Sequence, residues 1–280
     1  MECLQHQKNI VMKLKQFSLS LILFVVCYTN NCFSQGLKNS DGLTHTLNSR
    51  QHLAFESNKG DSIIYYQGYS VIFSYKYNLP RYVFNLLSVD QITSSSTHPP
   101  VKRSSTFFPA NLPNGKLSAT SADYLKSGYH RGHMVPAADF IWNKELKDET
   151  SLFTNINPQK AALNLGLWAN LESRIRHKVI KYSKNAYVVT GVIFNPKCEK
   201  KIGPNNLCVP TSFFKIIYFE SKKIMYAFLF DNTVDIYEGD ITDFQVTVDY
   251  IEKITGEDFF DLLSDDKEEE MESIIVKFND

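Results

Sequence analysis

The chain has 280 residues, of which 43% are hydrophobic and 21% are charged, and its 30 acidic side chains balance its 30 lysines and arginines. This composition is ordinary for a globular protein. The sequence has no internal repeat and no low-complexity tract, which excludes repeat and low-complexity architectures. The length allows one large domain or two small ones, with a core that needs no extra cross-links.

Three lysines near the N-terminus precede an apolar run over residues 17–28, which is too short to span a bilayer. The pattern predicts a secretory signal peptide over residues 1–35, cleaved near Ser34 or Gln35, with Met12 as a candidate for the true start. A buried N-terminal helix is the alternative. A lipoprotein signal is a weaker alternative, because Cys27 and Cys32 are not preceded by the small residues that such a signal requires. We therefore expect a secreted or periplasmic protein without a membrane segment after cleavage.

Cleavage would leave two cysteines, Cys198 and Cys208, on either side of a short loop rich in Gly, Pro and Asn. Two cysteines in an exported chain favour one disulfide bond. Two thiols alone are too few for a structural zinc site.

The charges are distributed unevenly along the chain. Residues 257–280 carry ten acids and two lysines, and we expect this tail to be a solvated helix face. The body, residues 36–256, has an excess of six positive charges. A mildly basic body is compatible with a polyanionic ligand but does not require one.

Residues 36–61 are polar and predict a loosely held lead-in, and the domain proper is expected over residues 62–280. The first half of this domain is rich in β-branched and aromatic segments that end in a long loop. We predict strands at 62–66, 69–75 and 81–87, a loop over 93–114, and a helical turn over 121–126.

The second half begins with a short helix at 145–151 and a strand at 152–156, which Asn157, Pro158 and Gln159 should end. The clearest helix spans 163–183, where apolar residues recur every four positions. We predict further strands at 186–194, 211–219 and 223–230, an edge strand at 244–248, and a last helical region from Asp249 that is interrupted at Gly256.

The stretch from 129 to 139 places His130, Arg131 and His133 within four residues. Gly132 should let the backbone approach a ligand closely, and Pro136 fixes the exit of the chain. With an ordinary pKa of roughly 6.5, His133 would be mostly neutral near pH 7 and able to accept a proton from water. A neighbouring guanidinium binds phosphate oxygens, so the pair suits attack on a phosphodiester. The alternative is an ordinary loop histidine.

His130 and His133 could instead hold a transition metal, which would make the protein a zinc hydrolase. The H-E-x-x-H pattern of zinc proteases is absent, and Gly132 and Pro136 argue against a helix here. We therefore consider a zinc site the weaker hypothesis.

One ridge of the predicted 163–183 helix carries Asn164, Trp168, Glu172 and Arg176 at intervals of four. Asn164 could be a helix N-cap or an oxygen ligand of Mg²⁺. Glu172 and Arg176 could form a surface salt bridge worth a few tenths of a kcal/mol. In the functional alternative, Glu172 holds a metal-bound water and Arg176 contacts phosphate.

Two motifs together resemble those of the DNA/RNA non-specific endonucleases, the ββα-metal or His-Me finger family. Residues 130–139 have the pattern H-R-G-H-x-x-P-x-x-D, where the family has D-R-G-H, and residues 164–172 have N-x-x-x-W-x-x-x-E. The segments at 154–159, 187–191 and 251–260 also resemble the family. The resemblance covers roughly residues 62–275, and the combined motifs are far more specific than R-G-H alone.

The resemblance implies an α+β fold with a mixed or antiparallel central sheet flanked by helices, and an endonuclease that acts on DNA and RNA and leaves 5′-phosphate ends. His133 would be the general base and Asn164 the single direct protein ligand of Mg²⁺, or of Mn²⁺ in its place. Glu172 would orient a metal-bound water. Three arginines would contact the phosphate: Arg103, Arg131 and Arg176.

The sequence departs from the family at His130, which replaces the usual Asp and cannot supply its negative charge. A second hypothesis is therefore a catalytically weakened, nuclease-like protein that binds nucleic acid without cutting it. The sequence leaves open whether the protein forms a homodimer.

Overall fold

A computed structural model of the chain describes residues 60–261 and 263–279. The predicted signal peptide and nearly all of the predicted lead-in lie outside these residues. Within them, no helix is both long enough and apolar enough to cross a membrane.

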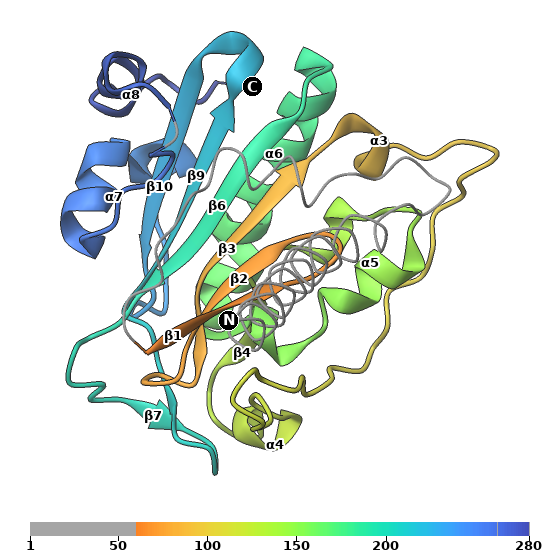
Figure 1. The fold of residues 1–280 in the computed structure, drawn as a ribbon, viewed down its shortest axis with the longest axis vertical. Coiled ribbons are helices and arrows are strands. Elements are labelled where there is room, and N and C mark those ends of the chain that lie inside the picture. The colour runs from red at the N-terminus through yellow and green to blue at the C-terminus, as the bar shows by residue number, and fades with distance from the viewer. Residues whose placement is uncertain (1–59, 262, 280) are drawn as a thin grey trace, which may run out of the picture. The chain divides into compact units, whose positions relative to one another are not determined.

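The core element is a seven-stranded sheet in the order β1-β2-β3-β6-β9-β10-β11, and every pair of neighbouring strands is antiparallel (Figure 1). The fold is therefore α+β with an antiparallel sheet, as expected. The strands are β1 Asp61–Tyr65, β2 Ser70–Ser74, β3 Leu79–Leu87, β6 Ala186–Ile193, β9 Ser212–Phe219, β10 Ile224–Asp231 and β11 Gln245–Val246.

The two central strands, β6 and β9, are buried almost throughout, as their continuous apolar sequences predicted. They pair with Val189 opposite Ile216 and Gly191 opposite Phe214. A Cβ atom at position 191 would lie 2.0 Å from the Phe214 ring, so only glycine allows this ring to cross the strand.

Helices cover both faces of the sheet. Side chains alternate along β9, so that Phe214 and Ile216 pack with Ile251 in the core formed under α7 (Val248–Thr255). Phe213 faces the other way and contacts Trp168 of α6 (Trp168–Tyr182) at 5.5 Å between ring centroids.

The C-terminal segment packs against both faces of the sheet, contrary to the expectation of a simple solvated helix. After α7 comes α8 (Asp265–Glu272), where Met271 and Glu272 are buried, and Phe278 beyond it is 1% exposed. Phe278 packs edge-on against Tyr226 and Phe228 of β10. Although many residues of the tail are charged, a few buried apolar side chains hold it against the sheet.

A second, two-stranded sheet is formed by β4 (His130–His133) and β5 (Ile156–Gln159). The prediction of a strand at 152–156 that ends at Asn157 was wrong, because a 3₁₀ turn at Phe153–Asn155 precedes a strand that includes Asn157, Pro158 and Gln159. Both strands of a two-stranded ribbon are edge strands. Proline, which has no N–H to donate, is tolerated there because no second neighbouring strand needs that hydrogen bond.

Short elements complete the described residues. They are the helices α3 Val89–Ile92, α4 Ser121–Tyr124 and α5 Lys144–Glu149, the 3₁₀ turns Ala137–Asp139, Glu220–Lys222 and Ile241–Phe244, and the hairpin strands β7 Lys201–Ile202 and β8 Leu207–Cys208. The predicted disulfide is present: Cys198 and Cys208 are bonded with their Cα atoms 5.6 Å apart.

Candidate active site

The β4–β5 ribbon carries the His/Arg stretch, with Gly132 opposite Asn157 and His133 opposite Ile156. A Cβ atom at position 132 would lie 2.4 Å from Oε1 of the buried Gln159 side chain. The glycine is therefore required by close packing inside the ribbon, and the expected approach of a ligand to its backbone is not needed to explain it.

Asn155 holds the chain in place directly after His133. Its backbone carbonyl accepts a bond from the Met134 N–H at 2.9 Å. Its side chain accepts from the Val135 N–H at 3.0 Å and donates back to the Val135 carbonyl at 2.9 Å. These three bonds fix the backbone on which the His133 ring is mounted.

The His133 ring lies among positive charges. Burial, and then the charges of Arg103 and Arg131, lower the pKa of His133 to about 3. Its Nε2 atom is buried and has no hydrogen-bond partner among the described residues. The ring is therefore neutral at physiological pH, as the sequence argument expected, and one nitrogen is free to take a proton.

Phe107 organises the two arginines around this histidine. The Cζ atoms of Arg131 and Arg103 lie 4.3 and 5.5 Å from the centre of the Phe107 ring, and the His133 ring centre is 5.3 Å away. Cation–π contacts of this kind hold guanidinium groups in place without neutralising their charge. This role of Phe107 was not predicted, because the residue lies in the long irregular loop and belongs to no motif.

Asn164 does not cap a helix. It lies inside a π-helical turn, Leu163–Leu167, which follows two helical residues at 161–162 and is separated from the regular helix α6 by a kink at Gly166 (φ −101°, ψ −112°). The prediction of one continuous helix from 163 therefore needs correction at its first turn. The Asn164 side-chain NH₂ donates to Nδ1 of His130 at 3.2 Å, which leaves the amide oxygen available to a ligand.

Glu172 lies one turn beyond Trp168 and has a buried carboxylate oxygen, Oε1, without a hydrogen-bond partner in the described chain. Burial raises the pKa of Glu172, and the positive charge of Lys215 opposes that rise. Lys215 is itself buried, with its Nζ 4.7 Å from the Trp168 ring centre and 2.5 Å from the Thr190 hydroxyl. Lys215 was not predicted as a site residue, although a single lysine within the apolar strand at 212–219 could have indicated it.

Arg176 pairs with Asp139, at 2.9 Å from Nη1 to Oδ1, and not with Glu172. The surface salt bridge considered between Glu172 and Arg176 is therefore not what the structure shows. Asp139 is 5% exposed, and burial raises its pKa while Arg176 lowers it. The last residue of the first motif thus anchors the helix that carries the second motif.

A cavity of about 440 Å³ brings most of the predicted site residues together. Arg176 is not among the residues that line it, and Lys147 is an addition that the sequence did not indicate. The lining side chains with polar or charged groups are Arg103, Arg131, His133, Lys147, Asn164, Trp168 and Glu172.

The zinc hypothesis finds no third ligand. In the part of the chain that the structure describes, neither His130 nor His133 belongs to a group of three or more His, Cys, Asp or Glu side chains able to hold a metal ion. Residues three apart on a strand point to opposite faces, and His130 is occupied by Asn164.

The sequence matches a family model described as DNA/RNA non-specific endonuclease over residues 48–266. The chain belongs to this family. Its members depend on a divalent metal ion. The first motif begins on β4 of the ribbon, and the second runs from the π-helical turn into α6.

The chain is similar to human mitochondrial endonuclease G, with 39% identity over 37% of each chain, and to the mitochondrial nuclease of Saccharomyces cerevisiae, with 34% identity over 50% of this chain and 49% of the relative. It therefore spans about a third to a half of the length of these relatives. A solved structure of the EndoG/EndoGI complex, which describes EndoG inhibition, matches 77% of this chain and 92% of that chain with 28% identity and a TM-score of 0.65.

The charges around His133 lead to a direct test. In the wild type, the His133 ring should stay neutral from pH 8 down to pH 5, because its pKa is lowered to about 3. Arg103→Gln removes one of the two repelling charges and should raise that pKa. A pH titration followed by NMR of the histidine rings measures the pKa of His133 in the wild type and in Arg103→Gln. Lys102→Gln, at the exposed neighbouring position, should leave the titration unchanged, and a wild-type His133 that titrates near pH 6.5 would contradict the assignment.

Proposed function

We propose that this protein is an exported, Mg²⁺-dependent endonuclease that hydrolyses the phosphodiester bonds of DNA and RNA. The observation that carries the proposal is one cavity that holds a neutral imidazole, two guanidinium groups and a buried carboxylate oxygen without a partner. These groups provide a base, a phosphate-binding surface and a place for a cation.

The residues present fit a divalent metal ion. Asn164 offers an amide oxygen, and Glu172 offers a buried oxygen whose desolvation no described hydrogen bond offsets. Oxygen donors of this kind suit Mg²⁺, or Mn²⁺ in its place, better than softer metals. Asn164 and Glu172 would hold the ion and its waters, and the bound ion would stabilise negative charge that develops on the phosphate oxygens.

His133 supplies the base in this proposal. Its unpartnered Nε2 takes a proton from water as the water oxygen bonds to phosphorus. The bond from phosphorus to the 3′-oxygen breaks, and the 3′-oxygen takes a proton from solvent, which leaves a 5′-phosphate and a 3′-hydroxyl. A pKa near 3 would make a weak base, but a bound phosphodiester offsets the charges of Arg103 and Arg131 and so raises the pKa of His133 when substrate is present.

Arg131 and Arg103, stacked on Phe107, are the arginines that we assign to the phosphate. Arg176 was predicted to contact phosphate as well. Its ion pair with the buried Asp139 supports a different role, in which it fixes the position of α6 relative to the first motif.

Two neighbouring cavities support a polyanionic substrate. A neighbouring cavity of about 400 Å³ shares Arg103, Arg131 and Asn164 and adds the aromatic rings of Tyr124 and Tyr129. A third cavity of about 830 Å³ shares Leu165 and runs along α6 past Arg174, His177, Lys178 and Lys181. Arg174 is paired with Asp240 at 3.0 Å and Lys178 donates to the Asn279 carbonyl at 2.6 Å, so Lys181 is the lysine that we test there. Basic groups interleaved with aromatic rings bind the backbone and bases of nucleic acid without reading sequence.

Plasmid cleavage tests the activity. We expect cutting of supercoiled DNA and of RNA in Mg²⁺, none in EDTA, and a loss of about 10²- to 10⁴-fold on His133→Ala, because the base is removed. His98→Ala, which changes an exposed histidine that packs on Trp142, serves as the matched control and should cut normally.

Filter binding with the same proteins separates the two hypotheses that the sequence raised. His133→Ala should still bind DNA. Binding by the wild type without any cutting would instead identify a nuclease-like binding protein, in which His130 does not replace the family's Asp adequately.

The groove along α6 makes a second prediction. In the His133→Ala background, Lys181→Gln should reduce the slope of log binding constant against log salt concentration by about 1, because one phosphate contact is lost. Lys184→Gln, at an exposed lysine outside that cavity, should leave the slope unchanged. Equal slopes for all three proteins would rule out this path for the substrate.

Export is proposed from the signal-peptide pattern of residues 1–35, and the disulfide between Cys198 and Cys208 supports an oxidising compartment. N-terminal sequencing of the protein recovered from periplasm and medium should find a mature chain that begins near residue 35. Full-length protein confined to the cytoplasm would contradict the proposal.

A further inference from the structure

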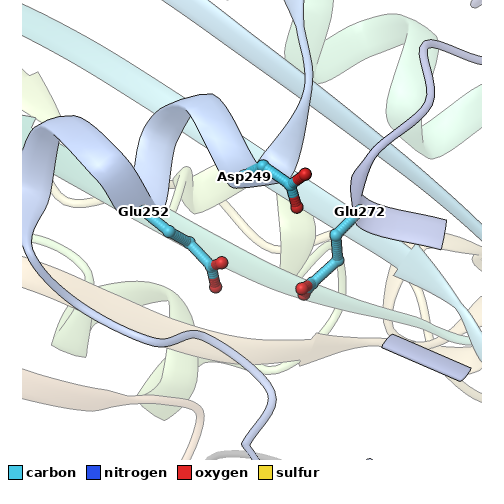
Figure 2. A group of neighbouring side chains, drawn as sticks. All are labelled: Asp249, Glu252 and Glu272. Atoms are coloured by element: carbon cyan, nitrogen blue, oxygen red, sulfur yellow. The ribbon is translucent and has the colours of Figure 1, made fainter. Parts of the chain in front are cut away.

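Three carboxylates converge away from the candidate active site (Figure 2). Asp249 and Glu252 project from α7, and Glu272 projects from the end of α8. One oxygen atom from each side chain lies within 4.8 Å of the other two. Like charges repel at this separation, so the arrangement needs a compensating partner.

Glu272 is the residue that points to a ligand. Its side chain is buried, with the residue 4% exposed, and its Oε1 atom has no hydrogen-bond partner among the described residues. Figure 2 shows its carboxylate directed toward those of Asp249 and Glu252. A buried and unpaired carboxylate oxygen is costly, and proteins pair such atoms or use them to bind an ion.

The other two acids make the cluster a usable donor set. Glu252 is held in place because its Oε1 accepts the Phe259 N–H at 2.7 Å, which leaves its second oxygen for the cluster. Asp249 is exposed and keeps one side of the cluster open to water. The site therefore offers three oxygen ligands from two helices, with room for solvent to complete a coordination shell.

The surrounding charges are also acidic. Glu268 and Asp258 also lie close enough to act on Glu272 electrostatically. A bound cation would offset the mutual repulsion of these acids.

We propose that Asp249, Glu252 and Glu272 form a binding site for Ca²⁺ that fastens α8 to α7. Ca²⁺ takes six to eight oxygen ligands in irregular geometry and accepts carboxylates in bidentate fashion, which matches three acids with a solvent-facing side. Mg²⁺ demands a regular octahedron and keeps more of its own water, so this set suits it less well.

The site is independent of the proposed catalytic one, because the two lie on opposite faces of the central sheet. Ile251 of α7 and Met271 of α8 pack in the core on one face, and Trp168 of α6 packs against Phe213 on the other. Met271 directly precedes Glu272, so an ion at the cluster would hold this core residue in place. The expected function is stabilisation of the C-terminal segment.

Equilibrium dialysis with ⁴⁵Ca²⁺ tests the proposal on the full chain. The Asn164→Ala background is used to remove the amide ligand of the proposed catalytic ion, so the remaining Ca²⁺ reports the cluster. We expect one bound Ca²⁺, at least tenfold weaker binding after Glu272→Gln, and no change after Glu269→Gln, which alters an exposed acid of the same helix. Unchanged Ca²⁺ binding in the Glu272→Gln protein would overturn the site.

Thermal unfolding gives a second readout that does not depend on activity. Saturating Ca²⁺ should raise the Tm of the Asn164→Ala protein by about 5 °C, and Glu272→Gln should abolish the increase. In EDTA, Glu272→Gln should unfold no earlier than its parent, because the change removes a repelling charge while it keeps the shape of the side chain. If Glu272→Gln nevertheless impairs folding, the exposed Asp249→Asn should show the same loss of Ca²⁺ response. A parent protein that gains no stability from Ca²⁺ would overturn the site.

Discussion

The candidate active site depends on four charged side chains that lie between α6 and the central sheet: Asp139, Glu172, Arg176 and Lys215. Burying ions costs several kcal/mol each unless they are paired. Two acids and two bases offset one another here, and Lys215 also donates hydrogen bonds to the Thr190 hydroxyl and, at 3.3 Å, to the Met134 carbonyl. This network joins the ribbon that carries the first motif, the helix that carries the second, and the sheet beneath both.

The network explains why residues far apart in the sequence share one cavity. Asp139 belongs to the first motif and Arg176 lies beyond the second, and their ion pair fixes the distance between ribbon and helix. Glu172 is one turn from Arg176 on α6, so its unpartnered oxygen faces the same region. His133 is carried on β4, directly before the Met134 carbonyl that Lys215 holds. Preorganised groups of this kind need no rearrangement when a substrate arrives.

The sequence predicted the parts of the fold that depend on local pattern. Continuous apolar runs located β6, β9 and β10, and the i+4 spacing located α6. It failed where a distant residue decides the local structure. Asn157 continues β5 because its amide donates to the Pro80 carbonyl from another strand at 2.9 Å, which no local rule can indicate. The buried residues of the acidic tail were missed for the same reason, because the sheet that covers them is formed elsewhere.

The candidate site shows the same division. His133, Arg131, Asn164 and Glu172 could be named because motif spacing marks them, and the structure places all four on one cavity. The orientation of Asn164 could not be named, since it follows from the break at Gly166 and from a partner, His130, that lies 34 residues earlier. Phe107 and Lys215 act through ring and charge contacts across the fold, and such contacts have no sequence period.

The overall neutrality of the chain hides a separation of charge between the two faces of the sheet. On the face of α6, Arg103, Arg131 and Lys147 line the cavity that contains His133. On the other face, the acids of α7 and α8 gather around Glu272. Buried apolar residues such as Val189, Phe214 and Ile216 lie between the two sets and keep them apart. The two proposed ligands thus meet charge of opposite sign on separate faces of the sheet: a polyanion on the side of α6, and a cation beside α7 and α8.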